Sequence, residues 1–462
     1  MKIRIIFPAQ LDLQNRPVHT RSREGKILNL SFIYLAGLTP SGHDVQVIDE
    51  FFEEISFDDP ADLVAITAMT SQAPRAYQIA KAFQQRGVPV VMGGFHATFF
   101  PDEAAGHVDA VVIGEAEGVW EALLEDAQKG ALKKFYKRQA PTTSLEGLPV
   151  PRYDLIDQKP YRYNYYPVWV GRGCPHDCSY CTVNRFYGRH VRVRPVADVI
   201  RDVAAVSAGR IFFIDDNLFS YRREYLNDLL SALVPYRLRW LAQMDPGTMN
   251  DPALLDLARK AGLEIAYIGM ESFSPDGLHR LSKGWADIDR YSRLVNDLHR
   301  RGIIVFASMM IGINRETPDT IRATLDRLEK LKVNELALYI LTPAPGSRMW
   351  EDLEAGGAGL PRNWSIYDGT HAITAPDGMT AAELENLYWS LYRRFYSPRS
   401  VMRRFARIPH SPHRFVLSVL RNLLVFSADV RACRSVHSND FSLKNLVPGY
   451  SSRYPGKTFP ES

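Results

Sequence analysis

The sequence predicts an α/β protein made of two parallel-sheet units and a helical C-terminal region. Strand-like β-branched runs alternate with amphipathic helices over residues 2–137, and the alternation returns between about residues 166 and 350. Such alternation is typical of parallel sheets, because two parallel strands are joined by a crossover helix. At 462 residues, with 46% hydrophobic and 23% charged residues, the chain is long enough for each unit to have its own core.

Residues 1–140 are expected to form a doubly wound, Rossmann-like domain. Its strand-like runs are IRIIF, DVQVID, DLVAIT, VPVVMGG and DAVVIG, and helical periodicity follows in APRAYQIAKAFQQRG and GVWEALLEDAQKG. Gly93 and Gly94 end one strand and Gly114 ends the next, which leaves backbone at the carboxyl edge that a nucleotide-like ligand can approach. The alternative is that these glycines only end strands and begin helices.

Residues 141–165 are rich in Pro, Tyr and turn-forming residues and are expected to be a linker. The runs YPVWVG, RIFFID, RLRWLAQM, EIAYIGM, IIVFASMMIG and ELALYIL then predict a partial (β/α)6 barrel over residues 166–350. Beyond residue 350 the strand pattern fades, so residues 351–462 are expected to be mainly helical with a loose polar tail.

The N-terminus and the cysteine content favour a cytoplasmic protein. The start, MKIRIIFPAQ, lacks the basic segment and the cleavage site of a signal peptide, and no run of 18 apolar residues occurs. Four cysteines in so long a chain do not make a disulfide framework. Clustered thiols in such a chain therefore indicate metal ligands or redox groups.

Three of the four cysteines lie in the stretch GRGCPHDCSYCTVNRFYGR. Cys174, Cys178 and Cys181 follow the first predicted barrel strand, at the carboxyl face where barrel chemistry lies. Three thiolates at this spacing can hold one side of an iron–sulfur cluster and leave one iron open. The alternatives are a structural zinc with His176 or His190 as its fourth ligand, and three unrelated buried cysteines.

The segment from Cys174 to Cys181, with the aromatic Tyr180 before the last cysteine, resembles the CxxxCxΦC loop of the radical S-adenosylmethionine (SAM) enzymes, in which Φ is aromatic. The resemblance implies a [4Fe-4S] cluster whose fourth iron binds SAM, with Cys174, Cys178 and Cys181 as its catalytic ligands. Reductive cleavage of SAM then gives a 5′-deoxyadenosyl radical that takes hydrogen from an unactivated carbon. The resemblance also implies an external electron donor such as flavodoxin or ferredoxin.

Polar motifs after the later barrel strands are similar to those of the same family. They are FFIDDNLF, LAQMD, IGMES, MIGINRET and LTPAPGS, in strand order. By similarity, Tyr180 packs near the adenine of SAM, and Glu271 and its neighbours contact the ribose or the methionyl part. The cofactor-binding residues that the resemblance implies in the barrel are Tyr180, Asp215, Asp216, Gln243, Glu271, Ser272 and Gly312. For Asp245 and Asn314, a local structural role such as a helix N-cap is an equal alternative.

The N-terminal domain resembles the cobalamin-binding domain that precedes the barrel in one branch of this family, the branch with the hopanoid methylases. ITAMTSQAPRA, VVMGGFHATFFPDEA and DAVVIGEAEGVWEALL are similar to loops that line the nucleotide tail of cobalamin. The cobalt-ligating DxHxxG motif is absent, since the spacing of His19 does not fit it. His96 is interpreted as a polar loop residue and not as a cobalt ligand. The cobalamin contacts that the resemblance implies are Thr70, Ser71, Gly93, Gly94, His96, Gly114 and Glu115.

Positive charge is concentrated near the C-terminus. Residues 393–434 carry ten arginines against one aspartate, in a chain whose net charge is +4. Residues 413–427 have an apolar stripe and an arginine-bearing stripe, which predicts an amphipathic helix. This helix either packs on the barrel or makes peripheral contact with an anionic membrane surface that admits a lipid substrate. No RNA-binding motif accompanies the charge, so nucleic acid is not an expected partner. Cys433 is interpreted as structural or incidental, with substrate chemistry as the alternative.

The leading hypothesis is a cobalamin-dependent radical SAM methyltransferase that acts on an unactivated carbon of a lipid or secondary metabolite. SAM is then used twice, once as methyl donor and once as radical source. The substrate carbon is expected between the two cofactors, at the interface of the domains. One alternative is a radical reaction without methyl transfer, namely cyclisation, rearrangement or aminocarboxypropyl transfer. Another is an iron–sulfur protein that does not cleave SAM.

Overall fold

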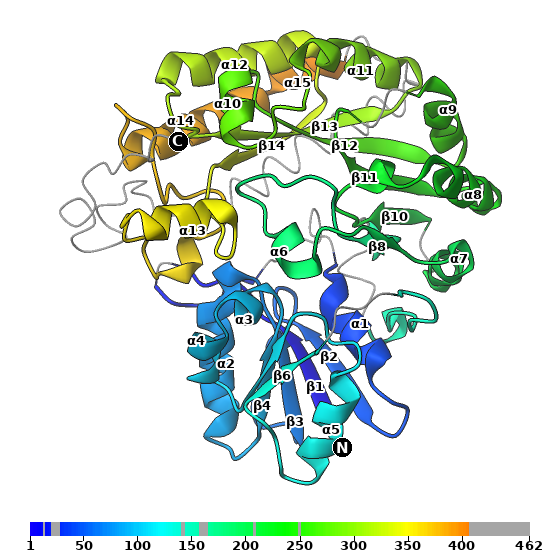
Figure 1. Cartoon of the computed structure of the whole chain (residues 1–462), viewed down its shortest axis with the longest axis vertical. Coiled ribbons are helices and arrows are strands. Elements are labelled where there is room, and N and C mark those ends of the chain that lie inside the picture. Colours follow the sequence, from blue (N-terminus) through cyan, green and yellow to red (C-terminus); the bar gives the residue numbers. More distant parts are fainter. Residues whose placement is uncertain are drawn as a thin grey trace.

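The computed structural model describes residues 1–12, 14–19, 28–139, 144–156, 165–206, 209–247 and 251–405. Two parallel sheets lie one above the other, the N-terminal sheet in blue and cyan and the second sheet mainly in green (Figure 1). A helical C-terminal segment, in yellow and orange, lies against both units. The predicted α/β class and the order of its units are thereby confirmed.

The N-terminal unit is a six-stranded parallel sheet in the order β2-β1-β3-β4-β5-β6. Its strands are buried apolar runs, as expected of a sheet that helices cover on both faces. Five of them match the predicted runs. β6 was not predicted, because it has only three residues and a single buried side chain. The strands are β1 (Lys2–Phe7), β2 (Asp44–Asp49), β3 (Leu63–Thr67), β4 (Val90–Gly93), β5 (Ala110–Ile113) and β6 (Phe135–Lys137).

Helices cover both faces of this sheet. α1 (Leu30–Leu38) and α5 (Trp120–Gln128) pack on one face, and α2 (Ala73–Gln84), α3 (Phe95–Phe99) and α4 (Pro101–Ala105) pack on the other. The 3-10 turn η1 (Thr70–Gln72) leads into α2. The unit is therefore doubly wound, and its carboxyl edge faces the barrel (Figure 1).

The second unit is a six-stranded parallel sheet in the order β14-β13-β12-β11-β10-β7. β7 and β14 end the sheet without pairing with each other, so the barrel is open, as predicted. Alternate residues such as Leu241, Ile265 and Ile304 form a small inner cluster, while their neighbours pack against the outer helices. The strands are β7 (Tyr166–Val168), β10 (Arg210–Phe213), β11 (Arg239–Met244), β12 (Leu263–Glu271), β13 (Ile304–Ile311) and β14 (Glu335–Ile340). The outer helices are α7 (Val196–Ala205), α8 (Arg223–Leu233), α9 (Pro252–Lys260), α10 (Pro275–Arg280), α11 (Ile288–Arg300) and α12 (Pro318–Leu331).

A short antiparallel hairpin interrupts the barrel after its first strand. β8 (Gly171–Arg172) pairs with β9 (Arg192–Val193), with Arg172 opposite Arg192. The hairpin encloses the cysteine loop, which we define as residues 173–181, and α6 (Val183–Tyr187). A Cβ at Gly171 would come within 2.5 Å of the Arg192 carbonyl oxygen and 2.7 Å of the Tyr221 hydroxyl, so this close approach requires glycine.

The C-terminal segment completes the core of the N-terminal unit. Trp350 of α13 (Arg348–Ala355), Trp364 of the 3-10 turn η5 (Trp364–Ile366) and Tyr367 join the cluster formed by α2, α3 and α4. α14 (Ala381–Phe395) begins at the capping box of Thr380 and Glu383 and packs on β14 and α12, and α15 (Pro398–Phe405) follows it.

Part of the predicted linker is packed. Tyr153 is 4% exposed, and its hydroxyl donates to the Pro167 carbonyl at 2.6 Å. The Arg152 N–H donates to the Ile33 carbonyl at 3.0 Å. The predicted amphipathic helix 413–427, Cys433 and the tail lie outside the described residues.

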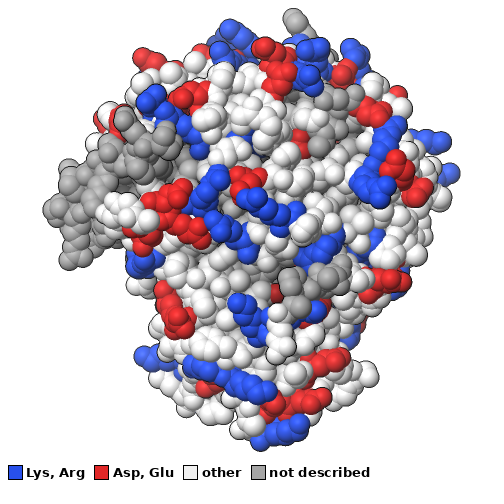
Figure 2. Space-filling model, viewed as in Figure 1, with Lys and Arg blue, Asp and Glu red and all other residues white. Residues whose placement is uncertain are grey.

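Two surface properties bear on partners. No described helix is long and apolar enough to cross a membrane. Figure 2 shows basic and acidic side chains interspersed over the face that Figure 1 presents. Five of the ten arginines in the arginine-rich stretch lie beyond residue 405, outside this description.

Trp364→Ala should destabilise the N-terminal unit. The indole is 4% exposed, its N–H donates to Glu103 Oε1 at 2.7 Å, and its loss should lower the free energy of unfolding by about 3–5 kcal/mol. Hydrogen exchange should show lost protection in α2 and α4. Trp285→Ala is the matched control, because Trp285 is 38% exposed. Unchanged exchange in α2 and α4 of Trp364→Ala would contradict the prediction.

The turn after β13 is held by the carboxylate of Glu316, which is partly buried. Gly312 has a φ of +86°, and the N–H groups of Gly312 and Ile313 donate to Glu316 Oε2 at 2.8 and 3.0 Å. Burial raises the pKa of Glu316 to about 7, although the two amides lower it.

Glu316→Gln should gain stability relative to the native protein as the pH rises. A carboxyl with a raised pKa holds its proton more tightly in the folded state, so its contribution to stability is present in acid and is lost as the pH rises through about 7. Thermal unfolding should show a midpoint difference that favours the variant more at about pH 8 than at about pH 5.

Glu383→Gln is the control of opposite sign. Glu383 Oε2 accepts from the Thr380 N–H and hydroxyl, both at 2.8 Å, and these bonds lower its pKa. This variant should be less stable than the native protein near neutral pH, and the difference should disappear in acid. The same pH trend for both variants would refute the assignment of Glu316.

Candidate functional site

The cysteine loop lies at the carboxyl end of the barrel. Cys174, Cys178 and Cys181 are partly buried free thiols, and the Cys181 N–H donates to the Cys178 carbonyl at 3.1 Å. Backbone bonds fix the loop on both sides. The Ser179 N–H donates to the Leu281 carbonyl at 3.1 Å, and the Met349 N–H donates to the Ser179 carbonyl at 2.8 Å. The three thiols therefore sit on a positioned backbone.

The donor set fits an iron–sulfur cluster better than a single zinc ion. Within the described ranges, no three His, Cys, Asp or Glu side chains converge closely enough to share one ion. In a cluster, cysteines bind through several irons and need not meet at one point. His176, a candidate zinc ligand, has its Nε2 3.1 Å from Asp245 Oδ2, and its ring stacks on Trp285 at 3.8 Å.

The thiols are protonated at neutral pH when no metal is bound. Burial raises the pKa of Cys174 to about 11 and that of Cys181 to about 12, and it also raises the pKa of Cys178. Thiolates are the metal-binding form, so binding of a cluster at these residues releases protons. Cluster assembly should therefore be favoured by high pH.

Tyr180 lies within the loop and packs against the apolar group of Leu281, Ile313 and Leu341. Burial raises its pKa, and the charge of Glu271 and a hydrogen bond with Cys178 raise it further. The predicted aromatic residue is thus packed between the cysteines and the later strands. Its contact with adenine stays a prediction.

Asp215 and Asp216, both predicted as cofactor-binding residues, have different surroundings. Asp215 is 3% exposed and accepts from the Gly171 N–H and the Tyr221 hydroxyl, each at 2.5 Å. It also accepts from the Val170 N–H at 3.0 Å. Burial raises the pKa of Asp215 to about 6. These bonds give Asp215 a structural role, because they hold the start of the hairpin.

Asp215 and Asp216 both line a cavity, and Asp216 is the less buried carboxyl of the pair. Burial, followed by the charge of Asp215, raises its pKa to about 7. Near neutral pH it is therefore present both as an acid and as a carboxylate. Such a group can exchange a proton or hydrogen bond with a polar ligand atom.

Glu271 ends β12 in a left-handed backbone conformation, with a φ of +62°. Its carboxylate accepts from Lys283 Nζ at 3.1 Å and from Ser308 Oγ at 3.2 Å. Glu271 and Lys283 are each 5% exposed. A strained residue that its surroundings hold in place is a candidate functional position. Ser272 is buried beside it, and Ser272 Oγ accepts from the Ser274 N–H at 3.1 Å.

The remaining predicted barrel residues lie on the same sheet. Gln243 shares the inner face of β11 with Leu241. Gly312 is in the turn after β13, where its missing Cβ would meet Leu384 Cδ2 at 2.7 Å. Asp245 is not the N-cap of any described helix, and its carboxylate accepts from the Gly247 N–H at 2.6 Å. The N-cap of the next helix, α9, is Asp251.

A cavity of about 360 Å³ lies between the N-terminal unit and the barrel. Gly93, Gly94, Gly114 and Glu115, four of the predicted cobalamin contacts, line it from the N-terminal unit, and Asp216 lines it from the barrel. Gly94 has a φ of +97°, and a Cβ there would come within 2.7 Å of the Ala68 carbonyl. At Gly114, with φ of +81°, nothing lies within 4 Å of the Cβ position, so the cavity opens beside bare backbone. A glycine-edged cavity at the carboxyl end of a parallel sheet fits the nucleotide part of cobalamin.

Three predicted cobalamin contacts do not line this cavity. Thr70 and Ser71 are in the turn η1, where Ser71 Oγ accepts from Gln10 Nε2 at 3.0 Å. His96 is 0% exposed, with its Nε2 2.8 Å from the Tyr77 hydroxyl and 3.3 Å from Glu103 Oε1. Its imidazole packs inside the core, against Trp364. His96 is therefore a buried residue of α3 and not the polar loop residue that the sequence suggested.

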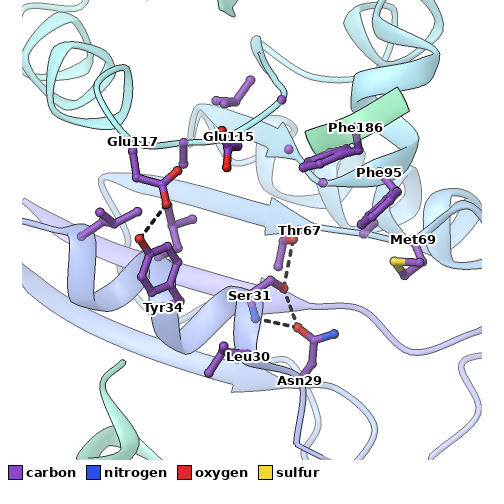
Figure 3. A pocket seen from close by; sticks show the side chains of 18 of the residues that line it. Asn29, Leu30, Ser31, Tyr34, Thr67, Met69, Phe95, Glu115, Glu117 and Phe186 are labelled. Atoms are coloured by element: carbon purple, nitrogen blue, oxygen red, sulfur yellow. Dashed lines mark hydrogen bonds between the residues drawn. The ribbon is translucent and has the colours of Figure 1, made fainter. Parts of the chain in front are cut away.

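Several cavity residues were not predicted. Figure 3 shows Asn29, Ser31 and Tyr34 of the α1 region together with Thr67 at the end of β3. Thr67 Oγ1 donates to Ser31 Oγ at 3.2 Å, and Asn29 caps α1 by accepting from the Ser31 N–H at 2.8 Å. The sequence Asn-Leu-Ser could be recognised as a possible helix start with Asn as the N-cap. Its neighbours in the sequence did not indicate that it lies beside β3.

Arg172, two residues before Cys174, was also missed. Its guanidinium lies 4.4 Å from the centre of the Trp169 ring and pairs with Glu115 Oε1 at 2.5 Å and with Glu117 Oε1 at 2.7 Å. Burial alone would lower the pKa of Arg172, but Glu117 and its other neighbours raise it. Burial alone would raise the pKa of Glu117. The charge and the hydrogen bond of Arg172 outweigh this effect, so the pKa of Glu117 is lowered.

Family models match both units of the chain. Residues 18–124 match the B12 binding domain, and residues 169–328 match the radical SAM superfamily. The uncharacterized methyltransferase PH0819 of Pyrococcus horikoshii is 30% identical over 432 residues, which cover 86% of this chain and 92% of that protein. The bacteriochlorophyllide d C-12(1)-methyltransferase of Chlorobaculum tepidum is 29% identical over 393 residues, which cover 82% of this chain and 85% of that protein. The hopanoid C-2 methylase of Rhodopseudomonas palustris is 23% identical over 390 residues, with coverages of 81% and 72%.

A solved structure has the same fold. TsrM of Kitasatospora setae, a radical SAM methyltransferase solved with cobalamin and a [4Fe-4S] cluster, superposes with a TM-score of 0.64 at 16% identity, over 93% of this chain and 99% of that chain. The two family matches follow the order of the two sheets, and the cofactors of the chain are a [4Fe-4S] cluster, SAM and cobalamin. The resemblance drawn from the cysteine loop is thereby confirmed. The chain belongs to the radical SAM superfamily, in the group of methyltransferases that carry a B12-binding domain in front of the radical SAM barrel.

Proposed function

We propose that the protein methylates an unactivated carbon of a lipid or secondary metabolite. The observation that carries this proposal is the shared cavity. Gly94 and Gly114 line it from the N-terminal unit, and Trp169, Arg172 and Asp216 line it from the barrel. A substrate at its mouth is within reach of both units. The names of the hopanoid C-2 methylase and the bacteriochlorophyllide d C-12(1)-methyltransferase specify methylation at a carbon, which supports this proposal.

Two separate sets of residues would hold the two metal-containing cofactors. Cys174, Cys178 and Cys181 would hold the cluster, and the glycine edge of the N-terminal sheet would hold the cobalamin tail. When bound, the cluster supplies an electron to SAM and cobalamin carries the methyl group. Glu271, fixed by Lys283 and Ser308, offers carboxylate oxygens for the ribose or methionyl part of SAM. Asp216 holds or exchanges a proton at the cavity wall.

An aromatic wall keeps water from the space between the units. Phe95 of α3 stacks on Phe186 of α6 with ring centres 4.4 Å apart, and Tyr187 meets Phe95 edge-on. Phe95, Phe186 and Tyr187 all line the cavity. Radical chemistry needs such shielding, because water and other hydrogen donors divert reactive intermediates.

A second reaction type is supported by one relative. The anaerobic magnesium-protoporphyrin IX monomethyl ester cyclase of Rubrivivax gelatinosus is 26% identical over 416 residues, which cover 80% of this chain and 74% of that protein. Cyclisation would use the cluster and SAM without methyl transfer. It differs from methylation in its products, since it forms no S-adenosylhomocysteine.

Two partners complete the proposal. An electron donor of the flavodoxin or ferredoxin type would reduce the cluster. Peripheral membrane contact would depend on the arginine-rich residues beyond position 405, which lie outside the described part of the chain.

Serine substitution of any one of Cys174, Cys178 and Cys181 should abolish the cluster, because three thiolates hold it. Iron and sulfide contents after anaerobic reconstitution should fall to the background level, together with 5′-deoxyadenosine formation from SAM. Cys433→Ser is the matched control and should retain both. Native-like iron content in a loop variant, or zinc in place of iron in the native protein, would refute the assignment.

Methyl transfer can be tested without knowing the substrate. Reduced protein loaded with cobalamin and given SAM should form S-adenosylhomocysteine in an amount equal to the bound cobalamin, and cobalamin-free protein should form none. With a substrate, trideuteromethyl SAM should label the product; bacteriochlorophyllide d and a hopanoid are the probes that the relatives suggest. Deoxyadenosine without S-adenosylhomocysteine would exclude methylation and favour cyclisation.

A further inference from the structure

Both strands of the hairpin that carries the cysteine loop pair with one carboxylate of the N-terminal unit. Arg172 Nη1 of β8 lies 2.5 Å from Glu115 Oε1, and Arg192 Nη1 of β9 lies 3.0 Å from Glu115 Oε2. The Arg172, Glu115 and Arg192 side chains are 12%, 9% and 10% exposed. Arg192 Nη2 also donates to Glu115 Oε1 at 3.1 Å, so the two guanidinium groups share the carboxylate. The group is largely desolvated, and charge-assisted bonds are strong in such a position.

The two arginines stand at the base of the hairpin. Arg172 and Arg192 are opposite each other in the antiparallel pair, and the chain between them includes the cysteine loop and α6. A carboxylate that holds both strands at this point fixes the base of the loop. Its removal leaves two buried guanidinium groups close together without Glu115, which favours separation of the strands.

Glu115 also lines the cavity between the two units. Gly114, Glu115, Ala116 and Glu117 form one loop after β5, and all of them line it. Glu117 Oε1 accepts from the Tyr34 hydroxyl at 2.6 Å, which ties the same loop to α1 (Figure 3). Arg192 is not among the cavity-lining residues. One loop therefore borders the cobalamin site on one side and the base of the cysteine hairpin on the other.

We propose that Glu115 is a positioning residue that couples cobalamin binding to the assembly of the iron–sulfur loop, through its ion pairs with Arg172 and Arg192. Cobalamin that orders the loop after β5 also orders Glu115 and the hairpin base. By reciprocity, a hairpin fixed by its cluster presents an ordered loop to cobalamin. The inference rests on the two cofactors and not on the group that is transferred.

Arg192→Gln tests the positioning role of Glu115 separately from any direct contact between Glu115 and cobalamin. The substitution removes one ion pair of Glu115, at a residue that neither lines the cavity nor lies in the cysteine loop. The affinity for hydroxocobalamin, measured by absorbance titration, is compared in apo protein and in protein with a reconstituted cluster. In the native protein the cluster should strengthen cobalamin binding at least about fivefold. In Arg192→Gln the ratio of the cobalamin affinities with and without the cluster should fall towards one. The amount of iron incorporated should no longer depend on cobalamin.

Arg185→Gln is the matched control. Arg185 lies on α6 inside the same hairpin and pairs at 2.8 Å with Glu351 of α13, so it has an ion pair but no contact with Glu115. It should retain the native ratio. Arg192→Lys keeps the charge and should restore part of the coupling, and Glu115→Gln should abolish it from the other side. Circular dichroism establishes that each variant is folded.

The results decide between coupling and two independent sites. The proposal would be overturned if the cluster did not change the cobalamin affinity of the native protein. It would also be overturned if the cluster strengthened cobalamin binding in folded Arg192→Gln as much as in the native protein. Either result would leave the proposal of methyl transfer intact. Loss of cobalamin affinity in Glu115→Gln with native coupling in Arg192→Gln would instead make Glu115 a simple cofactor contact. If Arg192→Gln does not fold, Arg192→Lys and Glu115→Gln decide by the same ratio, and native coupling in both overturns the proposal.

Discussion

The placement of Arg172 between Trp169 and the Glu115–Glu117 loop is the contact on which the arrangement of the molecule depends. A guanidinium buried this far requires paired carboxylates, and both of them come from the other unit. The pair therefore determines which edge of the N-terminal sheet meets the barrel. That edge is the carboxyl edge, where the glycine loops lie, and the residue that meets it is two positions from Cys174. Two cofactor sites built on separate sheets are brought to one space by the ion pairs of Arg172 and Arg192 with Glu115 and Glu117.

Much of the fold could be predicted because parallel strands covered on both faces read as continuous apolar runs. Eleven predicted runs correspond to strands β1 to β5, β7 and β10 to β14. β6, β8 and β9 were missed because two or three residues cannot show a period. The cysteine loop was readable because its chemistry depends on local spacing. Arg172 and Arg192 were not, because their partner Glu115 lies more than fifty residues away.

Residue type alone did not separate structural from functional polar groups. Asp215 and Asp216 are adjacent in sequence and both line the cavity, yet Asp215 is buried and its oxygens accept hydrogen bonds from the hairpin, whereas Asp216 is only partly buried. His96 illustrates the same limit, since the resemblance implied a cobalamin contact there, while its ring is enclosed by Tyr77, Glu103 and Trp364.

The aromatic residues that the segment 349–373 adds to the N-terminal core have a consequence for biosynthesis. On the ribosome, the first sheet emerges with the apolar face of α2, α3 and α4 uncovered, since Trp350, Trp364 and Tyr367 have yet to be translated. At roughly 5–20 residues per second, the wait is on the order of ten seconds or more. Nascent chains should therefore recruit a chaperone to this face until the C-terminal segment arrives, and truncation before residue 373 should yield an aggregation-prone product.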